Sequence, residues 1–286
     1  VRDDRELQEY ADLVEELWRR FCPFADDNFR SHAQRDFAAR YWEMHLASVL
    51  MQHGFQLEAD APAGGPDILT TLNGRRIWFE AVAVTDGQGP DAVPRDETAA
   101  ARPVPDRQMS LRLLQAVNAK LLQFQQALAR GDVRADDGYV VATNASQIEL
   151  AVLEPPGLPR IAKVLYGQGD AYVSLDVSSG KVVGTGFHER WAIKKASGSS
   201  VGSAFFHQPD AAAVSAVLYS RSSLNRMPAP TDVAARISDM GWDFVLIHNF
   251  LAAVPLAAGA LAVGTEWVVD GNNLSRRVHR DRPSTY

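Results

Sequence analysis

The sequence predicts an α/β fold in which a mixed central sheet is flanked by helices. Two apolar runs, residues 67–72 and 75–84, are joined by Asn73-Gly74, and this dipeptide between apolar runs is the strongest short-range signal for a β-hairpin. Amphipathic helical patterns precede and follow the hairpin, at about residues 27–52 and 106–130. The continuously apolar run 139–143 then predicts a strand that is buried on both faces.

The remaining elements follow from the same rules. An amphipathic pattern over residues 4–21 predicts an N-terminal helix that ends at Cys22-Pro23. Glycines are expected to end the two longer helices, at residues 54 and 131. Further strands are expected at the following segments: 55–59, 171–176 paired with 181–184, 213–219 and 242–248.

Three regions are predicted along the chain. Residues 1–27 form an N-terminal helical extension, residues 28–150 form the core, and residues 151–286 form a C-terminal α/β extension whose role the sequence does not reveal. A Pro- and Gly-rich stretch at residues 154–159 marks the soft boundary before that extension.

Composition restricts the class of protein. The 286 residues are 46% hydrophobic and 22% charged, as in an ordinary soluble protein. The net charge of −6 gives no global basic signature, so a nucleic-acid substrate would need a local basic groove. Cys22 is the only cysteine, which excludes disulfides within the chain and fits a reducing cytoplasm. The apolar run 250–264 contains Pro255 and is too short to span a bilayer, so no membrane association is expected.

Two acidic residues stand out in the hairpin. Asp67 opens its first strand and Glu80 lies within its second. A buried carboxylate is costly unless it is paired, hydrogen-bonded or bound to a cation. Two carboxylates brought together by a hairpin repel each other, and a hard divalent cation with oxygen ligands is the usual solution. The pair is therefore a candidate metal site.

A third acidic residue, Glu43, lies on the helix that precedes the hairpin. It sits beside the apolar stripe of that helix, between Tyr41 and Leu46. Taken alone, Glu43 is interpreted as a solvated helix residue. Its place on an acid-bearing helix directly before the Asp67 and Glu80 strands favours a functional role.

The order helix, three strands, helix, strand, together with Glu43, Pro66-Asp67 and Glu80, resembles the PD-(D/E)XK nuclease superfamily. The resemblance covers about residues 28–145 and implies a restriction-endonuclease-like αβββαβ core. It implies that Asp67 and Glu80 bind Mg²⁺ or Mn²⁺, with Glu43 as an outer or water-mediated ligand. The backbone carbonyl of Ala81 is implied as a further ligand.

The sequence departs from the family at one position. Val82 stands where the family has a lysine that activates or orients the attacking water. The 106–130 helix offers Lys120 as a replacement, and Arg112 and Gln123 near the same side are assigned to the substrate phosphate. The alternative for Lys120 is a surface lysine whose stem covers apolar neighbours.

Three interpretations of function remain open. The first is a cytoplasmic, metal-dependent nuclease that hydrolyses phosphodiester bonds in nucleic acid, with DNA as the expected substrate. The second is a catalytically inactive nuclease-fold protein that acts as a binding or scaffolding module. The third makes Asp67 and Glu80 strand-end surface acids of an unrelated α/β protein. A homodimer is left open. Contact of Lys120 with the acid pair would favour catalysis, whereas Val82 packed over Glu80 would favour binding.

Other candidates are weaker. The long segment 86–105 is expected to be a functional or mobile loop. No histidine pair has zinc-site spacing, and His248 is interpreted as a satisfied buried histidine rather than a cleft residue. The four arginines at positions 276, 277, 280 and 282 are interpreted as part of a solvated, poorly ordered tail.

Overall fold

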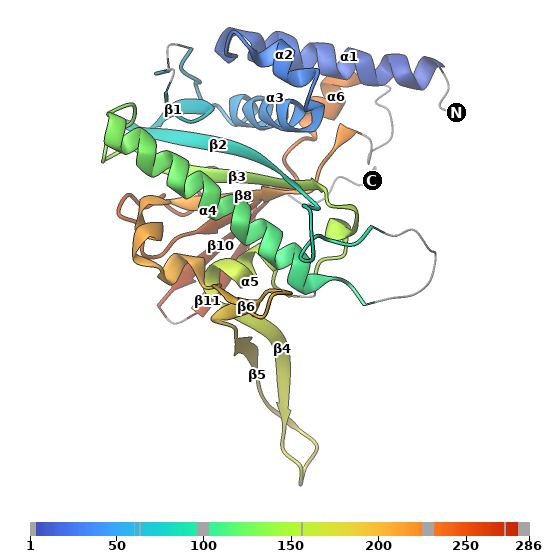
Figure 1. Cartoon of the computed structure of the whole chain (residues 1–286), viewed down its shortest axis with the longest axis vertical. Coiled ribbons are helices and arrows are strands. Elements are labelled where there is room, and N and C mark those ends of the chain that lie inside the picture. Colours follow the sequence, from blue (N-terminus) through green and yellow to red (C-terminus); the bar gives the residue numbers. More distant parts are fainter. Residues whose placement is uncertain are drawn as a thin grey trace.

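The computed structural model describes residues 4–59, 61–62, 64–95, 103–155, 157–224, 232–271 and 273–279. In these residues a seven-stranded sheet has the order β1-β2-β3-β8-β9-β10-β11. Figure 1 shows α1, α2, α3 and α6 on one side of this sheet, and α4 and α5 on the other. The predicted α/β fold with a mixed central sheet is confirmed.

Parallel and antiparallel pairs alternate irregularly across the sheet. The pairs β2–β3, β3–β8 and β9–β10 are parallel, and β1–β2, β8–β9 and β10–β11 are antiparallel. The strands have the following bounds: β1 Ile68–Leu72, β2 Arg75–Thr85, β3 Gly138–Gln147, β8 Ala216–Ser220, β9 Val245–His248, β10 Thr265–Asp270 and β11 Asn273–Val278. The region 151–286 thus contributes four strands to the sheet that begins with the predicted core.

The helices end where local chemistry stops them. They have the following bounds: α1 Asp4–Phe21, α2 Phe29–Ala33, α3 Phe37–Gln52, α4 Asp106–Arg130, α5 Arg160–Tyr166 and α6 Val233–Ser238. α4 ends at Gly131, whose φ of 83° is left-handed and whose N–H bonds back to the last turn. The bounds of α4 agree with the prediction.

Two hydrophobic clusters hold the layers together. On one face of the sheet, α1, α3 and α6 pack over Ile68, Ile77 and Phe79. On the other face, α4 and α5 pack over Trp78, Tyr139 and further residues of β3 and β8. Because side chains alternate along a strand, consecutive residues of β2 belong to opposite clusters. The odd-numbered residues from 77 to 81 therefore face α1, α3 and α6, and the even-numbered residues from 78 to 84 face α4 and α5.

The hairpin forms as predicted. Asn73 and Gly74 both have positive φ, 52° and 77°, which is the requirement of a type I′ turn. This turn fixes the register Leu72↔Arg75 to Ile68↔Phe79. α4 then connects β2 to β3, which run parallel.

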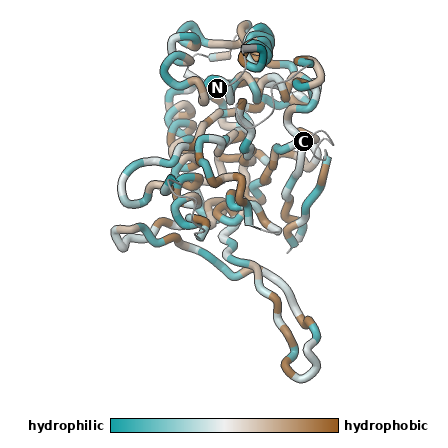
Figure 2. The backbone as a smooth tube through the Cα atoms, turned by 90° about the vertical axis from the view of Figure 1, so that its right-hand side faces the viewer, coloured by the Kyte–Doolittle hydropathy of each residue, from teal (hydrophilic) through white to brown (hydrophobic). Residues whose placement is uncertain are grey.

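Two smaller sheets lie outside the main one. The strands β4 Gln168–Leu175 and β5 Val182–Glu189 pair as a hairpin that projects far from the body (Figures 1 and 2). This hairpin, predicted from 171–176 and 181–184, is confirmed and is longer than predicted. The strands β6 Ala192–Lys194 and β7 Ser200–Gly202 pair beside its base.

Three expectations about local structure were wrong. The single helix predicted over 27–52 is broken, because the Asp36 carboxylate accepts the Ala39 N–H and begins α3 anew. The strand predicted at 55–59 is reduced to one bridge, Leu57↔Thr70. Residues 275–278, predicted as poorly ordered tail, belong to β11.

Some predictions fall on residues that the structure does not describe. Arg280 and Arg282 lie outside the described residues, as do positions 96–102 of the predicted 86–105 loop. In the described part of that loop, Arg95 and Asp86 form an ion pair at 3.1 Å. None of the helices in the described part of the chain combines the length and apolar character that a bilayer-spanning segment needs.

Candidate functional site

The hairpin brings Asp67 and Glu80 to adjacent positions. Its register pairs Ile68 with Phe79, so that one further step places Asp67 opposite Glu80. β1 begins at Ile68, so Asp67 lies just before the paired part of the strand. Its carboxylate, instead of a strand carbonyl, accepts the Ala81 N–H at 2.8 Å. Since the N–H and C=O of one strand residue point to the same side, the Ala81 carbonyl faces the Asp67 side as well.

Glu80 faces α4. It shares a face of β2 with Trp78, which packs in the α4-side cluster. The Lys120 ammonium group contacts Glu80 Oε1, so the helix lysine reaches the hairpin acid from 40 residues along the chain. Both side chains are largely buried, with 19% of Lys120 and 11% of Glu80 exposed.

The turn of α4 that carries Lys120 is fixed by aromatic packing. The Tyr139 hydroxyl donates to the Lys120 carbonyl at 3.0 Å. The Tyr139 ring stacks on Phe124 with centroids 3.9 Å apart. Since Tyr139 lies in β3, next to β2, these contacts hold Lys120 at the level of Glu80.

Glu43 approaches from the other side of the sheet. It lies on α3 and is 4% exposed, so it is not the solvated glutamate of the simplest sequence interpretation. Its two carboxylate oxygens contact Arg40 Nη1 at 2.7 and 2.8 Å. Arg40 was not singled out from the sequence, although its i,i+3 spacing before Glu43 was the available signal.

Burial raises the pKa of all three acids, and the charge of Asp67 adds to this effect at Glu43 and Glu80. Burial, reinforced by the charge of Asp67, raises the pKa of Glu43 to about 9 against the opposing effect of Arg40. Burial and the same neighbour raise the pKa of Glu80 to about 7 although Lys120 opposes them. Burial also raises the pKa of Asp67, against Lys120 and the Ala81 N–H. Three carboxyl groups of this kind resist ionising together unless additional positive charge joins them.

The oxygen atoms at this site are of the kind that binds a hard cation, but the three acids are not grouped around one point. Carboxylate and carbonyl oxygens of Asp67, Glu80 and Ala81 are the ligands that Mg²⁺ prefers. Among the residues that the structure describes, however, no group of three or more His, Cys, Asp or Glu side chains is placed to hold a metal ion. Glu43 is engaged by Arg40 and Glu80 by Lys120. A bound cation would therefore rely on Asp67, Glu80 and the Ala81 carbonyl.

Val82 follows Glu80 on the face of β2 that packs against α4, whereas the two residues assigned to phosphate lie on other turns of α4. Val82 is partly buried and packs against the α4-side cluster. Arg112 donates to the Thr85 carbonyl at 2.9 Å and to Gln115 at 2.6 Å. Its eight-residue separation from Lys120 corresponds to about 12 Å along the helix axis. Gln123 is exposed on α4. Arg112 and Gln123 are thus not gathered around the acid pair.

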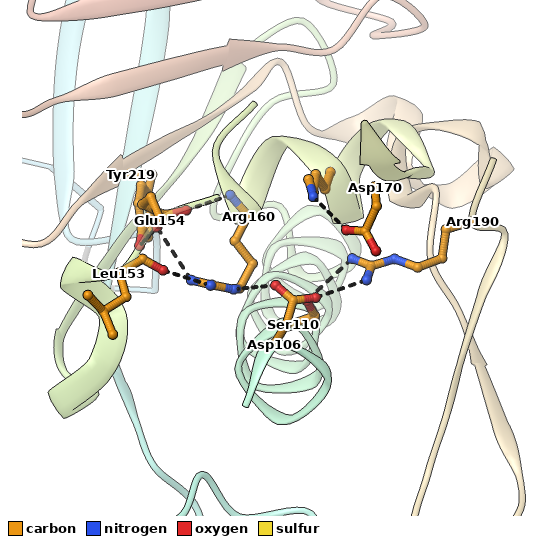
Figure 3. Close-up of polar contacts among 9 residues, drawn as sticks. Asp106, Ser110, Leu153, Glu154, Arg160, Asp170, Arg190 and Tyr219 are labelled. Atoms are coloured by element: carbon orange, nitrogen blue, oxygen red, sulfur yellow. Dashed lines mark hydrogen bonds and ion pairs between the residues drawn. The ribbon is translucent and has the colours of Figure 1, made fainter. Parts of the chain in front are cut away.

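A second polar cluster, not expected from the sequence, lies where α5 meets α4 (Figure 3). Arg160 is 2% exposed, and its guanidinium donates to Asp106 at 2.7 Å and to the Leu153 carbonyl at 2.9 Å. Its backbone N–H and the Tyr219 hydroxyl both donate to Glu154, each at 2.7 Å. The signal in the sequence was an arginine within an apolar run, Arg160 to Tyr166.

Asp106 joins this cluster to the projecting hairpin. Its second oxygen accepts Arg190 Nη1 at 3.1 Å, and Arg190 directly follows β5. Burial opposes ionisation of Asp106, but Arg160 and Arg190 together lower its pKa. Because these charges pair with one another, we assign the cluster a structural role.

A third cluster surrounds Glu266 in β10. His248 Nε2 lies 2.6 Å from one of its oxygens and His279 Nε2 lies 3.1 Å from the other. The Gly259 N–H donates to both oxygens, at 2.8 and 3.1 Å. His248 is thus a buried histidine with a partner, as predicted.

Comparison with protein-family models, with curated protein sequences and with solved structures gave no match.

Proposed function

We propose that this protein hydrolyses phosphodiester bonds of nucleic acid, with DNA as the first substrate to test, and with Mg²⁺ or Mn²⁺ held at the Asp67–Glu80 pair. The observation that carries the proposal is the contact of Lys120 with Glu80. A cation from α4 thereby stands beside the hairpin acids, where the adjacent same-face position of β2 holds only Val82. Structural ion pairs are common, but this one lies beside a second carboxylate, Asp67, that has no ion pair of its own among the described contacts.

The element order supports the same proposal. A helix with a buried acid, a hairpin with two acids, a helix with a lysine and a parallel strand follow one another from α3 to β3. This order resembles the restriction-endonuclease-like core, with its first strand shortened to the bridge at Leu57.

Each side chain would have one task. Asp67, oriented by the Ala81 N–H, and Glu80 would hold the cation together with the Ala81 carbonyl. When bound, such a cation lowers the pKa of a water ligand and neutralises charge that develops on phosphorus. Lys120 would donate a hydrogen bond to the attacking water or to a phosphate oxygen. Glu43, held by Arg40, would act through water.

The test is cleavage of single- and double-stranded DNA and RNA with Mg²⁺ or Mn²⁺. We expect Asp67→Asn and Glu80→Gln to abolish cleavage, and Lys120→Met to reduce it by about 10² to 10³, the usual cost of one electrostatic group. Lys181→Met, at the tip of the projecting hairpin, removes the same charge at an exposed site and should leave the rate unchanged.

A relocation variant makes the role of the lysine specific. Residues 80 and 82 share a strand face, so Val82→Lys combined with Lys120→Met returns the cation to the strand. Partial recovery of cleavage by this double variant would identify the ammonium group as the functional element. Cleavage that persists in Asp67→Asn or Glu80→Gln would refute the proposed site.

A second candidate is a non-catalytic nuclease-like binding module. It is favoured by the engagement of Glu80 by Lys120 and of Glu43 by Arg40, and by Val82 packing into the α4-side cluster. Absence of cleavage on every substrate, together with no Mg²⁺ binding by calorimetry, would select this module.

A further inference from the structure

The projecting hairpin, residues 168–189, is held firmly at its base. Lys163 on α5 donates to Asp170 in β4 at 3.1 Å. After β5, the Arg190 N–H donates to the Gly167 carbonyl at 2.7 Å, and its guanidinium contacts Asp106 (Figure 3). Both strands are therefore anchored to helices of the body, and the hairpin leaves the body in a defined direction (Figure 2).

The hairpin is amphipathic. Its register pairs Ala171 with Phe187, Val173 with Thr185 and Leu175 with Val182, and residues paired in this way lie on one face. This apolar face is uncovered toward the tip: Val173 is 60%, Leu175 57% and Val182 60% exposed. The opposite face is less apolar: it pairs Ser174 with Gly184 and Tyr172 with Gly186, and Tyr172 is 40% exposed. A register shift beside Leu175 leaves Val183, which is 67% exposed, outside these pairs.

Such a hairpin needs a partner surface. A two-stranded ribbon is marginally stable in water unless a further layer covers it, and a contiguous exposed apolar patch marks an interaction site. Residues 168–189 contain three acidic residues and one lysine. This charge disfavours a nucleic-acid partner, which requires basic groups. The uncovered face therefore fits an apolar protein surface.

The same chain carries a matching groove. A cavity of about 770 Å³ lies at the base of the hairpin, a volume typical of sites that enclose a ligand-sized apolar group. Residues Ala171, Val173 and Phe187 of the hairpin line one part of it, and Trp267, Val269 and Leu274 of β10 and β11 line another. An apolar tip and an apolar groove on one chain are the two halves of a self-complementary contact.

We infer that a second copy of this chain covers the hairpin, in a two-fold arrangement in which the apolar tip of each hairpin enters the groove at the base of the other. In a two-fold dimer each tip fills the groove of the other subunit, so both tips and both grooves are covered at once. Eight residues per strand give a ribbon about 26 Å long. Contact through such a ribbon is at the small end of specific interfaces, so the dimer is a weak one that dissociates in the micromolar range. This inference does not depend on the proposed hydrolysis.

The test is sedimentation velocity of the full chain over a concentration series from about 1 to 200 µM, the range that a micromolar dimer requires. The wild type should pass from monomer to dimer. Leu175→Asp places a charge on the apolar face and should weaken dimerisation at least tenfold. Ser174→Asp places the same charge one residue away on the opposite face and should leave it within twofold.

A shortened hairpin provides a second, independent variant. Joining Val173 to Thr185 through Asn-Gly keeps a paired register and a compatible turn, and it keeps the anchored base. This variant should remain monomeric at every concentration, with an unchanged melting temperature of the body. A wild type that is monomeric throughout, or equal loss of dimer in Ser174→Asp and Leu175→Asp, would overturn the inference. Binding of wild-type monomer to DNA or to lipid vesicles, lost in Leu175→Asp, would also overturn it by assigning the hairpin another partner.

Discussion

Glu80 and Glu266 are buried carboxyl groups in two strands of one sheet, yet their electrostatics are opposite. The side chain of Glu80 is 11% exposed and that of Glu266 is 1% exposed. Burial raises the pKa of Glu80 to about 7. Burial also acts on Glu266, but the Gly259 N–H and the two histidines overcome it and lower its pKa.

The difference lies in what surrounds each carboxyl group. Glu266 accepts from the Gly259 amide and contacts a ring nitrogen of His248 and of His279. Glu80 has Lys120 as its partner but also has Asp67 as a neighbour of like charge. A carboxylate whose donors are complete stabilises the fold, whereas one beside further carboxylates retains affinity for a cation. Each of the following measurements tests this contrast.

The largest effect is expected at Glu266. Glu266→Ala removes the acceptor for the Gly259 N–H and the two histidines, and buried donors left without partners cost about 3 kcal/mol of unfolding free energy in total. Urea denaturation at pH 7 measures this loss. Glu16→Ala, which removes the two ion pairs of Glu16 on the surface of α1, should cost less than about 1 kcal/mol. An equal loss of unfolding free energy in the two variants would show that Glu266 has no larger structural role than a surface residue.

Substitution of Glu43 is expected to stabilise the protein as pH rises, whereas substitution of Glu266 destabilises it. Its pKa is about 9 in the folded protein and about 4.3 in an unfolded chain. Between these values the folded state holds a proton that the unfolded state lacks, so the unfolding free energy falls as pH rises, by about 1.4 kcal/mol per unit. Glu43→Gln removes this slope. Relative to wild type, we expect it to gain about 2 kcal/mol between pH 7 and 8.5.

Glu266→Gln is the matched comparison for that experiment. The pKa of Glu266 is lowered in the folded state, so its contribution is present above the unfolded pKa and is lost as pH falls through the folded value. The destabilisation by Glu266→Gln should therefore disappear under acidic conditions. A Glu43→Gln variant that loses stability relative to the wild type as pH rises would contradict the raised pKa of Glu43.

The sequence predicted the parts of the fold that local rules determine. Asn73-Gly74 fixed the hairpin because few residue pairs accept positive φ at both positions. Gly131 marked the end of α4 for the same reason. The sequence left Lys120 open between a replacement cation near the acids and a surface lysine, and the structure places its ammonium group in contact with Glu80.

Contacts between distant segments were not predictable in the same way. The carboxyl of Glu266 meets His248 and His279 only because β10 pairs with both β9 and β11, and no spacing in the sequence reveals that order. The burial of Glu43 likewise depends on how α3 is packed between α1 and the sheet. The segment 55–59 meets β1 at one bridge only, Leu57↔Thr70, and its apolar content does not reveal how short that pairing is.

The smallest expected effect concerns Mg²⁺ itself. A ligand that binds only the folded state stabilises it by about 1.4 kcal/mol at roughly ten times its dissociation constant. Mg²⁺ titrated at pH 8 should therefore raise the melting temperature of the wild type by a few degrees. Asp67→Asn should remove this shift, since it removes a ligand, while Glu266→Gln should keep it because its site is complete without a cation. A shift of equal size in Asp67→Asn would mean that the cation binds elsewhere, and the distinction between the two carboxyl groups would then be one of pKa alone.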